Sequence, residues 1–312
     1  MHVCFAAPSM ISFPTVLRLF LELLCLGLVS LYAAGAELLT DFRPSAVRSE
    51  YGAVSEIKFS TALIEVESGV LAHHLPQAMR DFRFAEAVWI IGYKTEILDS
   101  QGRPPRENYL CHTFFGDQRV TQHEDQEIKG IYSDAFTPQV QLPEGFGILL
   151  TPDEGLHWMP MFNNRDEQPA RVAMNTILVV IRGKDLKRPL TPLYSTLRSV
   201  AVPHLFFVPP GRHEKTTTFE CPFDGRIHFL GTHMHPHGVS IELFNVSRRE
   251  RVWKGSRTLD AKGRMVGMEV YSSGEGYSVR AGETYRVTAV YDNPTRGSID
   301  AMAGLFMLYS RR

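Results

Sequence analysis

Hydrophobic and polar positions group into short segments along most of this chain. Runs rich in Val, Ile, Thr, Tyr and Phe are bounded by Gly, Pro, Asn and Asp, as in AVWIIGYKTEIL (87–98), MNTILVVIRG (174–183), RIHFLGTHMH (226–235), VSIELFNV (239–246) and ETYRVTAVYDN (283–293). Such runs are typical of β-strands that are separated by tight turns. Turn signals such as LPEGFG and DAKGR recur between them, and helical periodicity is weak. The pattern predicts an all-β protein built from antiparallel, jelly-roll-like β-sandwiches.

The length of the chain predicts two such domains. The 312 residues are 44% hydrophobic and 21% charged, which is enough apolar material for a substantial core. The proline-bearing stretch KDLKRPLTPLYS (184–195) is the best boundary. We therefore expect an N-terminal β-sandwich over 37–188 and a C-terminal β-sandwich over 189–312. The net charge of −1 argues against a nucleic-acid partner, which would favour a basic excess.

The first 36 residues read as a signal peptide. Arg18 precedes an apolar run that ends in Ala34-Gly35-Ala36, the small-residue pattern of a signal-peptidase site. The run is short and interrupted by Glu22, which favours cleavage over retention as a membrane anchor. We expect an exported protein, periplasmic or extracellular, with no stable membrane association after cleavage.

Only two cysteines, Cys111 and Cys221, remain in the mature chain if that segment is removed. Export permits a disulfide between them, but two cysteines are not a disulfide framework. Three alternatives stay open at this point: the two thiols pair, they remain free and buried, or they bind a metal.

The segment GTHMHPHG (231–238) places His233, His235 and His237 at every second position. Alternate residues of a β-strand share one face, so two of these imidazoles can act as a metal clamp. Near the C-terminus, IDAMAGLFMLYS (299–310) carries Met302 at the head of an apolar run. A thioether suits Cu(I), although a lone Met more commonly fills a gap in a core.

Together these segments resemble the C-terminal domain of the copper type II, ascorbate-dependent monooxygenases, the family of peptidylglycine α-hydroxylating and dopamine β-monooxygenases. In that family a strand ends in His-x-His, and a Met on a later strand completes the catalytic copper. VPPGR (208–212) resembles the segment that opens the family's second domain, and Cys221 lies at a position where the family has a structural cysteine. The likeness spans about residues 87–312. It implies that His233, His235 and Met302 bind copper, accept O2 and generate the species that abstracts a substrate hydrogen. His237, which follows Pro236, is expected either to support these ligands from behind or to act as an alternative ligand.

The family's second copper, held by three histidines in the N-terminal domain, has no full counterpart here. The matching places are LCHTFFGD (110–117) and LHWMPMFNN (156–164). They offer Cys111, His112, His157 and Met161, which would form an altered soft-metal site or pack in the core. The family's substrate-carboxylate contacts fall on Gly231, Gly304 and Phe306, none of which can pair with a carboxylate. A small or apolar substrate is therefore expected.

Three functional hypotheses follow. The first is an oxidoreductase, a copper monooxygenase that hydroxylates a small molecule with O2 and with ascorbate or another reductant. It would contain one copper ion or, as an alternative, two. The second is an exported copper carrier without hydroxylase activity. The third is a metal-free binding module in which GTHMHPHG is an exposed turn. The copper content and the distance of Met302 from the histidine pair distinguish them.

Overall fold

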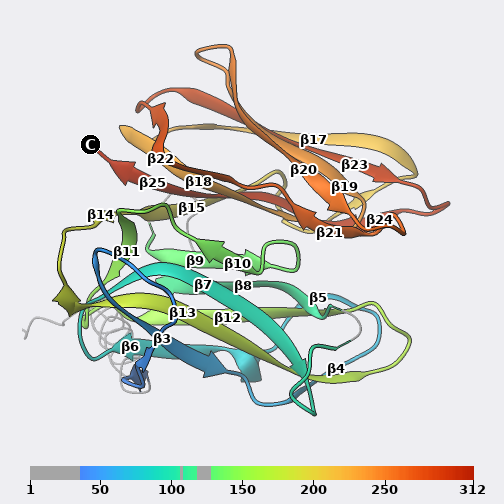
Figure 1. Cartoon of the computed structure of the whole chain (residues 1–312). Helices are drawn as coiled ribbons and strands as arrows, with labels where there is room; N and C mark the ends of the chain where they lie inside the picture. Colours follow the sequence, from blue (N-terminus) through green and yellow to red (C-terminus); the bar gives the residue numbers. More distant parts are fainter. Residues whose placement is uncertain (1–35, 106–107, 118–127) are drawn as a thin grey trace, which may run out of the picture.

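The computed structural model describes residues 36–105, 108–117 and 128–312. Within them the chain forms β-strands and one short 3-10 helix, η1 (Pro76–Ala78). The strands form two tandem β-sandwiches that pack against each other (Figure 1). The ladders are antiparallel, except for the short pairs β1–β6 and β11–β14, which are parallel. The expectation of an all-β protein with tandem, jelly-roll-like sandwiches is confirmed.

Two sheets make the N-terminal sandwich. The first contains β1 (Glu37–Leu39), β5 (Val70–His74), β6 (Arg80–Phe84), β8 (Leu110–Asp117), β9 (Gly130–Asp134) and β12 (Leu156–Asn164). The second contains β2 (Arg43–Pro44), β3 (Gly52–Ser60), β4 (Ile64–Val66), β7 (Val88–Asp99), β10 (Gln139–Gln141), β11 (Phe146–Leu150), β13 (Ala170–Leu186) and β14 (Thr191–Pro192). Phe59 of the second sheet packs on Phe82, Phe115 and Trp158 of the first, with ring centroids 5.0 Å apart in each pair. These aromatic side chains fill the space between the sheets.

The C-terminal sandwich follows from residue 194. One sheet contains β15 (Tyr194–Ser199), β18 (Gly225–Met234), β22 (Tyr271–Val279) and β25 (Ala303–Arg311). The opposite sheet contains β17 (Gly211–Glu220), β19 (Gly238–Asn245), β20 (Glu250–Leu259), β21 (Met265–Met268) and β23 (Thr284–Asn293). β16 (Phe206–Val208) and β24 (Ile299–Ala301) form a separate pair. The sheets divide the chain between β14 and β15, because β14 still pairs with β11 of the N-terminal sandwich.

Alternate side chains of β18 and β25 point into different sandwiches, so this sheet contributes to both cores. Leu230, Leu305 and Met307 point into the C-terminal core. Phe306 and Leu308 point the other way and belong to the buried cluster of the N-terminal sandwich. One face of this sheet is therefore an inter-domain face, and strand parity assigns His233 to it, because His233 lies opposite Gly304, two residues from Phe306.

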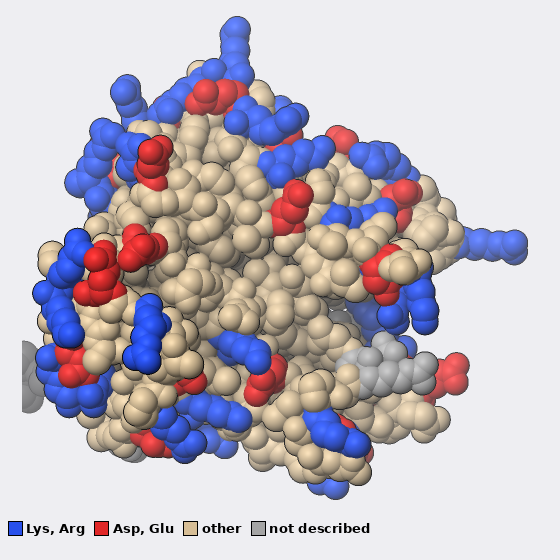
Figure 2. All heavy atoms as spheres, viewed as in Figure 1, with Lys and Arg blue, Asp and Glu red and all other residues tan. Residues whose placement is uncertain are grey.

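Acidic and basic side chains are interspersed on the face shown in Figure 2, in keeping with the small net charge.

The predicted signal peptide, 1–36, lies outside the described residues except for Ala36. In the part of the chain that the structure describes, no helix has the length and apolar character needed to cross a bilayer.

Candidate metal site between the sandwiches

His233 and His235 lie at the end of β18, on the face that turns toward the N-terminal sandwich. Both are buried, with 6% and 3% of their surface exposed. His233 is the penultimate residue of β18, and His235 follows the last one. The main-chain N–H of His235 donates to the carbonyl oxygen of Met302 at 3.2 Å, which extends the β18–β25 ladder by one residue. The strand thus fixes both imidazoles on one face, as the spacing predicts.

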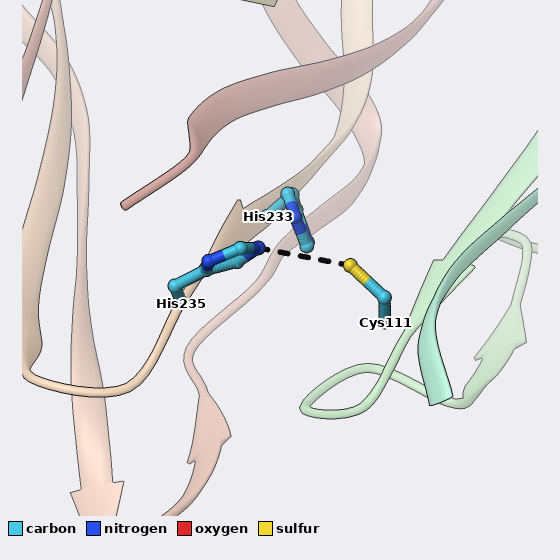
Figure 3. A group of neighbouring side chains, drawn as sticks. All are labelled: Cys111, His233 and His235. Atoms are coloured by element: carbon cyan, nitrogen blue, oxygen red, sulfur yellow. Dashed lines mark hydrogen bonds between the residues drawn. The ribbon is translucent and has the colours of Figure 1, made fainter. Parts of the chain in front are cut away.

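Cys111 of β8 reaches the same point from the N-terminal sandwich (Figure 3). Its Sγ lies 3.6 Å from Nε2 of His235. One ligand atom from each of Cys111, His233 and His235 lies within 4.8 Å of the other two. The β8–β12 register shifts between Met161 and Phe162, so Cys111 sits at an irregularity in the ladder. These three buried side chains can hold a metal ion.

Carboxylates hold the outer nitrogens of both imidazoles. His233 Nδ1 lies 3.2 Å from Oδ2 of Asp134, and His235 Nδ1 lies 2.6 Å from Oδ2 of Asp300. An ionised carboxylate accepts hydrogen bonds only, so Nδ1 is the donor in each pair, and in a neutral ring Nε2 then keeps its lone pair. Among the described residues, Nε2 of His233 is buried without a hydrogen-bond partner. Metal-binding histidines show this carboxylate–imidazole arrangement, and a metal would satisfy the unpaired nitrogen.

Burial sets the protonation of two of the donors, His235 and Cys111. It lowers the pKa of His235 to about 4, against the opposing hydrogen bond to Asp300, so the ring is neutral near pH 7. Burial also raises the pKa of the Cys111 thiol well above its ordinary value, and the nearby carboxylate of Asp134 adds to the rise. Without a cation the sulfur therefore stays protonated, and a bound metal would stabilise the thiolate and release the proton.

A cleft of about 400 Å³ opens beside the donors. Cys111, His233 and His235 form part of its lining, and so does Arg165. The remaining walls combine apolar residues, among them Leu110, Phe136, Pro236, Met265 and Val266, with the polar side chains of Asn108, Asn163 and Arg264. A metal held by the three donors would therefore be accessible to a small molecule from this cleft.

Met302 lies between β24 and β25, next to the histidine pair. Since Met234 pairs with Ala303, the register places Met302 opposite His235, on the inter-domain face. Its carbonyl oxygen accepts hydrogen bonds from the N–H of His235 and from the hydroxyl of Tyr291. The main chain thus puts Met302 beside the site, and coordination by its sulfur stays a prediction.

His237 takes a different course from the other two histidines. It follows Pro236 in the connection from β18 to β19 and has a φ of 71°, a left-handed conformation that is uncommon for residues other than glycine. Its carbonyl oxygen accepts the N–H of Asp292. This turn takes His237 out of the strand, and it is not a member of the three-donor group.

The structure does not gather the N-terminal candidates into one site. Nδ1 of His157 is bound to Oδ1 of Asp81 at 2.6 Å, and His157 lies opposite Gly116, four residues along β8 from His112. Met161 lies opposite His112. The pattern in the sequence assigned Cys111 to this group, whereas the fold brings it to the C-terminal histidines.

His112 is a neighbour of the three-donor group. Its Nδ1 lies 3.4 Å from Sγ of Cys111, and its ring centroid lies 4.7 Å from that of His233. It also stacks on Tyr132. His112 therefore borders the proposed metal site, while His157 does not.

Sequence reasoning missed the residues that orient the donors, Asp134, Asp300 and Arg165. Asp300 stands two residues before Met302 in IDAM, which is a weak signal for a role in the site. Asp134 and Arg165 belong to the other sandwich, and no spacing connects them to the histidines. Only the docking of the sandwiches brings them within hydrogen-bond distance.

Cys111 and Cys221 are both free thiols in the structure. The Sγ of Cys221 donates to the carbonyl oxygen of Phe223 at 3.2 Å, inside the C-terminal sandwich. The alternative of a Cys111–Cys221 disulfide is therefore not realised.

No known protein family and no curated protein matches the chain. Solved structures similar to it include the major capsid protein P2 of bacteriophage PM2, with 8% identity, 80% of this chain and 97% of that chain covered, and a TM-score of 0.35. Cowpea mosaic virus top component matches with 10% identity, 86% and 92% coverage, and a TM-score of 0.37. Likenesses at this level of identity say nothing about the function of this chain.

Proposed function

We propose that this chain is a copper protein that binds one metal ion between its two sandwiches through Cys111, His233 and His235. One observation carries the proposal. Both histidines are anchored at Nδ1 by a carboxylate, and one ligand atom of each lies within 4.8 Å of the other and of Cys111 Sγ. A buried pair oriented in this way, with one unpaired nitrogen, suits a metal better than it suits ordinary packing.

The donor set favours copper over other metals. Thiolate and imidazole ligands suit both zinc and copper, but a thioether at Met302 would be a soft ligand that selects Cu(I). The register that places Met302 opposite His235 supports this choice. Zinc is the competitor that the experiment must exclude.

The activity that we propose is monooxygenation of a small, largely apolar molecule in the adjoining cleft. Two observations support it: the likeness of the His-x-His and Met segments to the copper monooxygenases, and the apolar residues in the wall of the cleft beside the donors. Copper bound there would supply one-electron redox chemistry and a place for O2. The overall reaction inserts one oxygen atom into a C–H bond and reduces the other to water, with two electrons and two protons from ascorbate or a similar donor. The protein's own residues, Asp134 and Asp300, hold both rings in place.

A copper carrier is the second candidate. The observation that favours it is the thiol of Cys111, which lies against the histidine pair and would complete a three-donor Cu(I) site without O2 or substrate. A carrier of this kind would bind one copper tightly and consume no O2.

One experiment tests both candidates. Copper per chain is measured by elemental analysis after anaerobic loading of the mature protein with Cu(I), and after the same loading in the presence of Zn(II). The variants are Cys111→Ala, His233→Ala/His235→Ala and Met302→Ala, with His157→Ala as a control outside the donor group. One copper in the wild type and in the control, lost from the first two variants, supports the site. O2 uptake with ascorbate then separates a monooxygenase from a carrier. If no copper is retained, both proposals fail and a metal-free binding module remains.

A further inference from the structure

Arg165 connects the two sandwiches at the metal site. It follows β12 of the N-terminal sandwich, and its guanidinium binds the carboxylate of Asp300 in the C-terminal sandwich with two hydrogen bonds. Nη1 lies 2.9 Å from Oδ1 and Nη2 lies 2.8 Å from Oδ2. A two-point contact of this kind fixes the plane of the carboxylate as well as its position.

The same carboxylate orients a metal-binding side chain. Oδ2 of Asp300, which accepts from Arg165, also accepts from Nδ1 of His235 at 2.6 Å. Rotation of the carboxylate about its Cβ–Cγ bond would turn Oδ2 away from the imidazole. The two bonds from Arg165 oppose that rotation, so they act on the imidazole through Asp300.

The other histidine also depends on the N-terminal sandwich. Asp134, which holds Nδ1 of His233, belongs to β9. The N-terminal sandwich therefore provides the thiol of Cys111, the partner of His233 and the anchor of the His235 partner. The C-terminal sandwich provides the two imidazoles, His233 in β18 and His235 directly after it, and the carboxylate of Asp300.

We propose that Arg165 is a positioning residue: through Asp300 it keeps His235 in the Nδ1–H form with Nε2 directed at Cys111, and so makes metal affinity depend on the docking of the two sandwiches. The part that concerns metal affinity rests on the proposed copper site. The part that concerns the imidazole does not, because it applies equally to the protein without metal. By linkage, a metal that binds the docked arrangement more tightly also stabilises it.

The first test uses metal-free protein and reads the imidazole directly. Long-range 1H–15N NMR spectra distinguish the two neutral forms of a histidine ring. We expect a single Nδ1–H form of His235 in the wild type and in Arg182→Gln, and a mixture in Arg165→Gln. Arg182 is the matched control, because it also belongs to the N-terminal sandwich and pairs with an aspartate, Asp185, at 2.6 Å. An unchanged His235 signal in folded Arg165→Gln would overturn the proposal.

The second test measures Cu(I) affinity by competition with a chelator. We expect Arg165→Gln and Asp300→Asn each to weaken binding about 10- to 100-fold, the range typical of such outer contacts. The double variant should bind no more weakly than Asp300→Asn, because Arg165 acts through Asp300. Arg165→Lys should recover part of the affinity, since Lys keeps the charge but not the two-point contact.

Two results in the second test would contradict the proposal. One is full additivity of the two substitutions. The other is an affinity of Arg165→Gln equal to that of Arg182→Gln at equal loss of thermal stability, which would mean a structural role only. If the wild type binds no copper, the proposed function fails, while the NMR result still decides the role of Arg165.

Discussion

The Sγ atom of Cys111 lies 3.6 Å from Nε2 of His235, although 124 residues separate them in the chain. The contact crosses from the N-terminal to the C-terminal sandwich. It arises because β8 is irregular against β12 at this residue and because the histidine face of β18 is also the inter-domain face. The candidate metal site is therefore a property of the docked pair of sandwiches, and most of the experiments below test that conclusion.

Removal of the thiol should weaken metal binding without unfolding the chain. We expect Cys111→Ala to reduce Cu(I) affinity by at least about 100-fold, since a direct donor matters more than the outer contacts that contribute 10- to 100-fold. Co(II) added to the wild type should give a sulfur-to-metal charge-transfer absorption that Cys111→Ala lacks. Cys221→Ala is the control, because Cys221 is also a buried free thiol but lies in the C-terminal core. Equal absorption in both variants would exclude Cys111 as a ligand.

The partner of His233 offers a matched comparison. Asp134→Asn weakens the hold on Nδ1 of His233, and we expect a 10- to 100-fold loss of Cu(I) affinity. Asp81→Asn alters an equivalent carboxylate–imidazole pair at His157, outside the donor group, and should leave the affinity unchanged. Affinity is measured by chelator competition at fixed pH. A similar loss in both variants would show that the effect does not come from the site.

The number of metal ions per chain should be one. Because His157 pairs with Gly116, four residues along β8 from His112, and its Nδ1 is bound to Asp81, we expect His157→Ala to bind as much copper as the wild type. Elemental analysis after Cu(I) loading and gel filtration checks this. A second copper per chain that disappears in His157→Ala would restore the separate N-terminal site expected from the sequence.

Stability at acid pH should depend on Glu283. Burial of Glu283 would raise its pKa, but hydrogen bonds from Tyr285 and Arg248 outweigh burial and hold the pKa below its ordinary value. The group then stabilises the fold above the unfolded pKa of about 4.3, and this contribution is lost as the pH falls through the lower folded pKa. We expect Glu283→Gln to flatten the dependence of the unfolding free energy on pH below about 5. Urea unfolding at several pH values measures it, and Glu214→Gln, an exposed residue of β17, is the control. An equal slope in both variants would contradict this assignment.

Local sequence was sufficient for the strands and for half of the site. Alternation of apolar and polar residues is a local property, so the all-β fold could be read from runs such as RIHFLGTHMH. The same two-residue period placed His233 and His235 on one face, and the structure keeps them there. The turn at Pro236 that separates His237 was equally local, since proline interrupts a strand.

The rest of the site required the tertiary structure. Cys111 was visible in the sequence as a soft donor, but its place beside His233 and His235 was not, because likeness of segments does not reveal a shifted register in β8. Asp134, Arg165 and Asp300 carried no pattern that joined them to the histidines. The sequence by itself determined strand parity and the donor types that β18 presents. Only the packing of one sandwich on the other decided which thiol and which carboxylates meet those donors, because hydrogen bonds and metal coordination act over a few ångströms and depend on distances between residues remote in the chain.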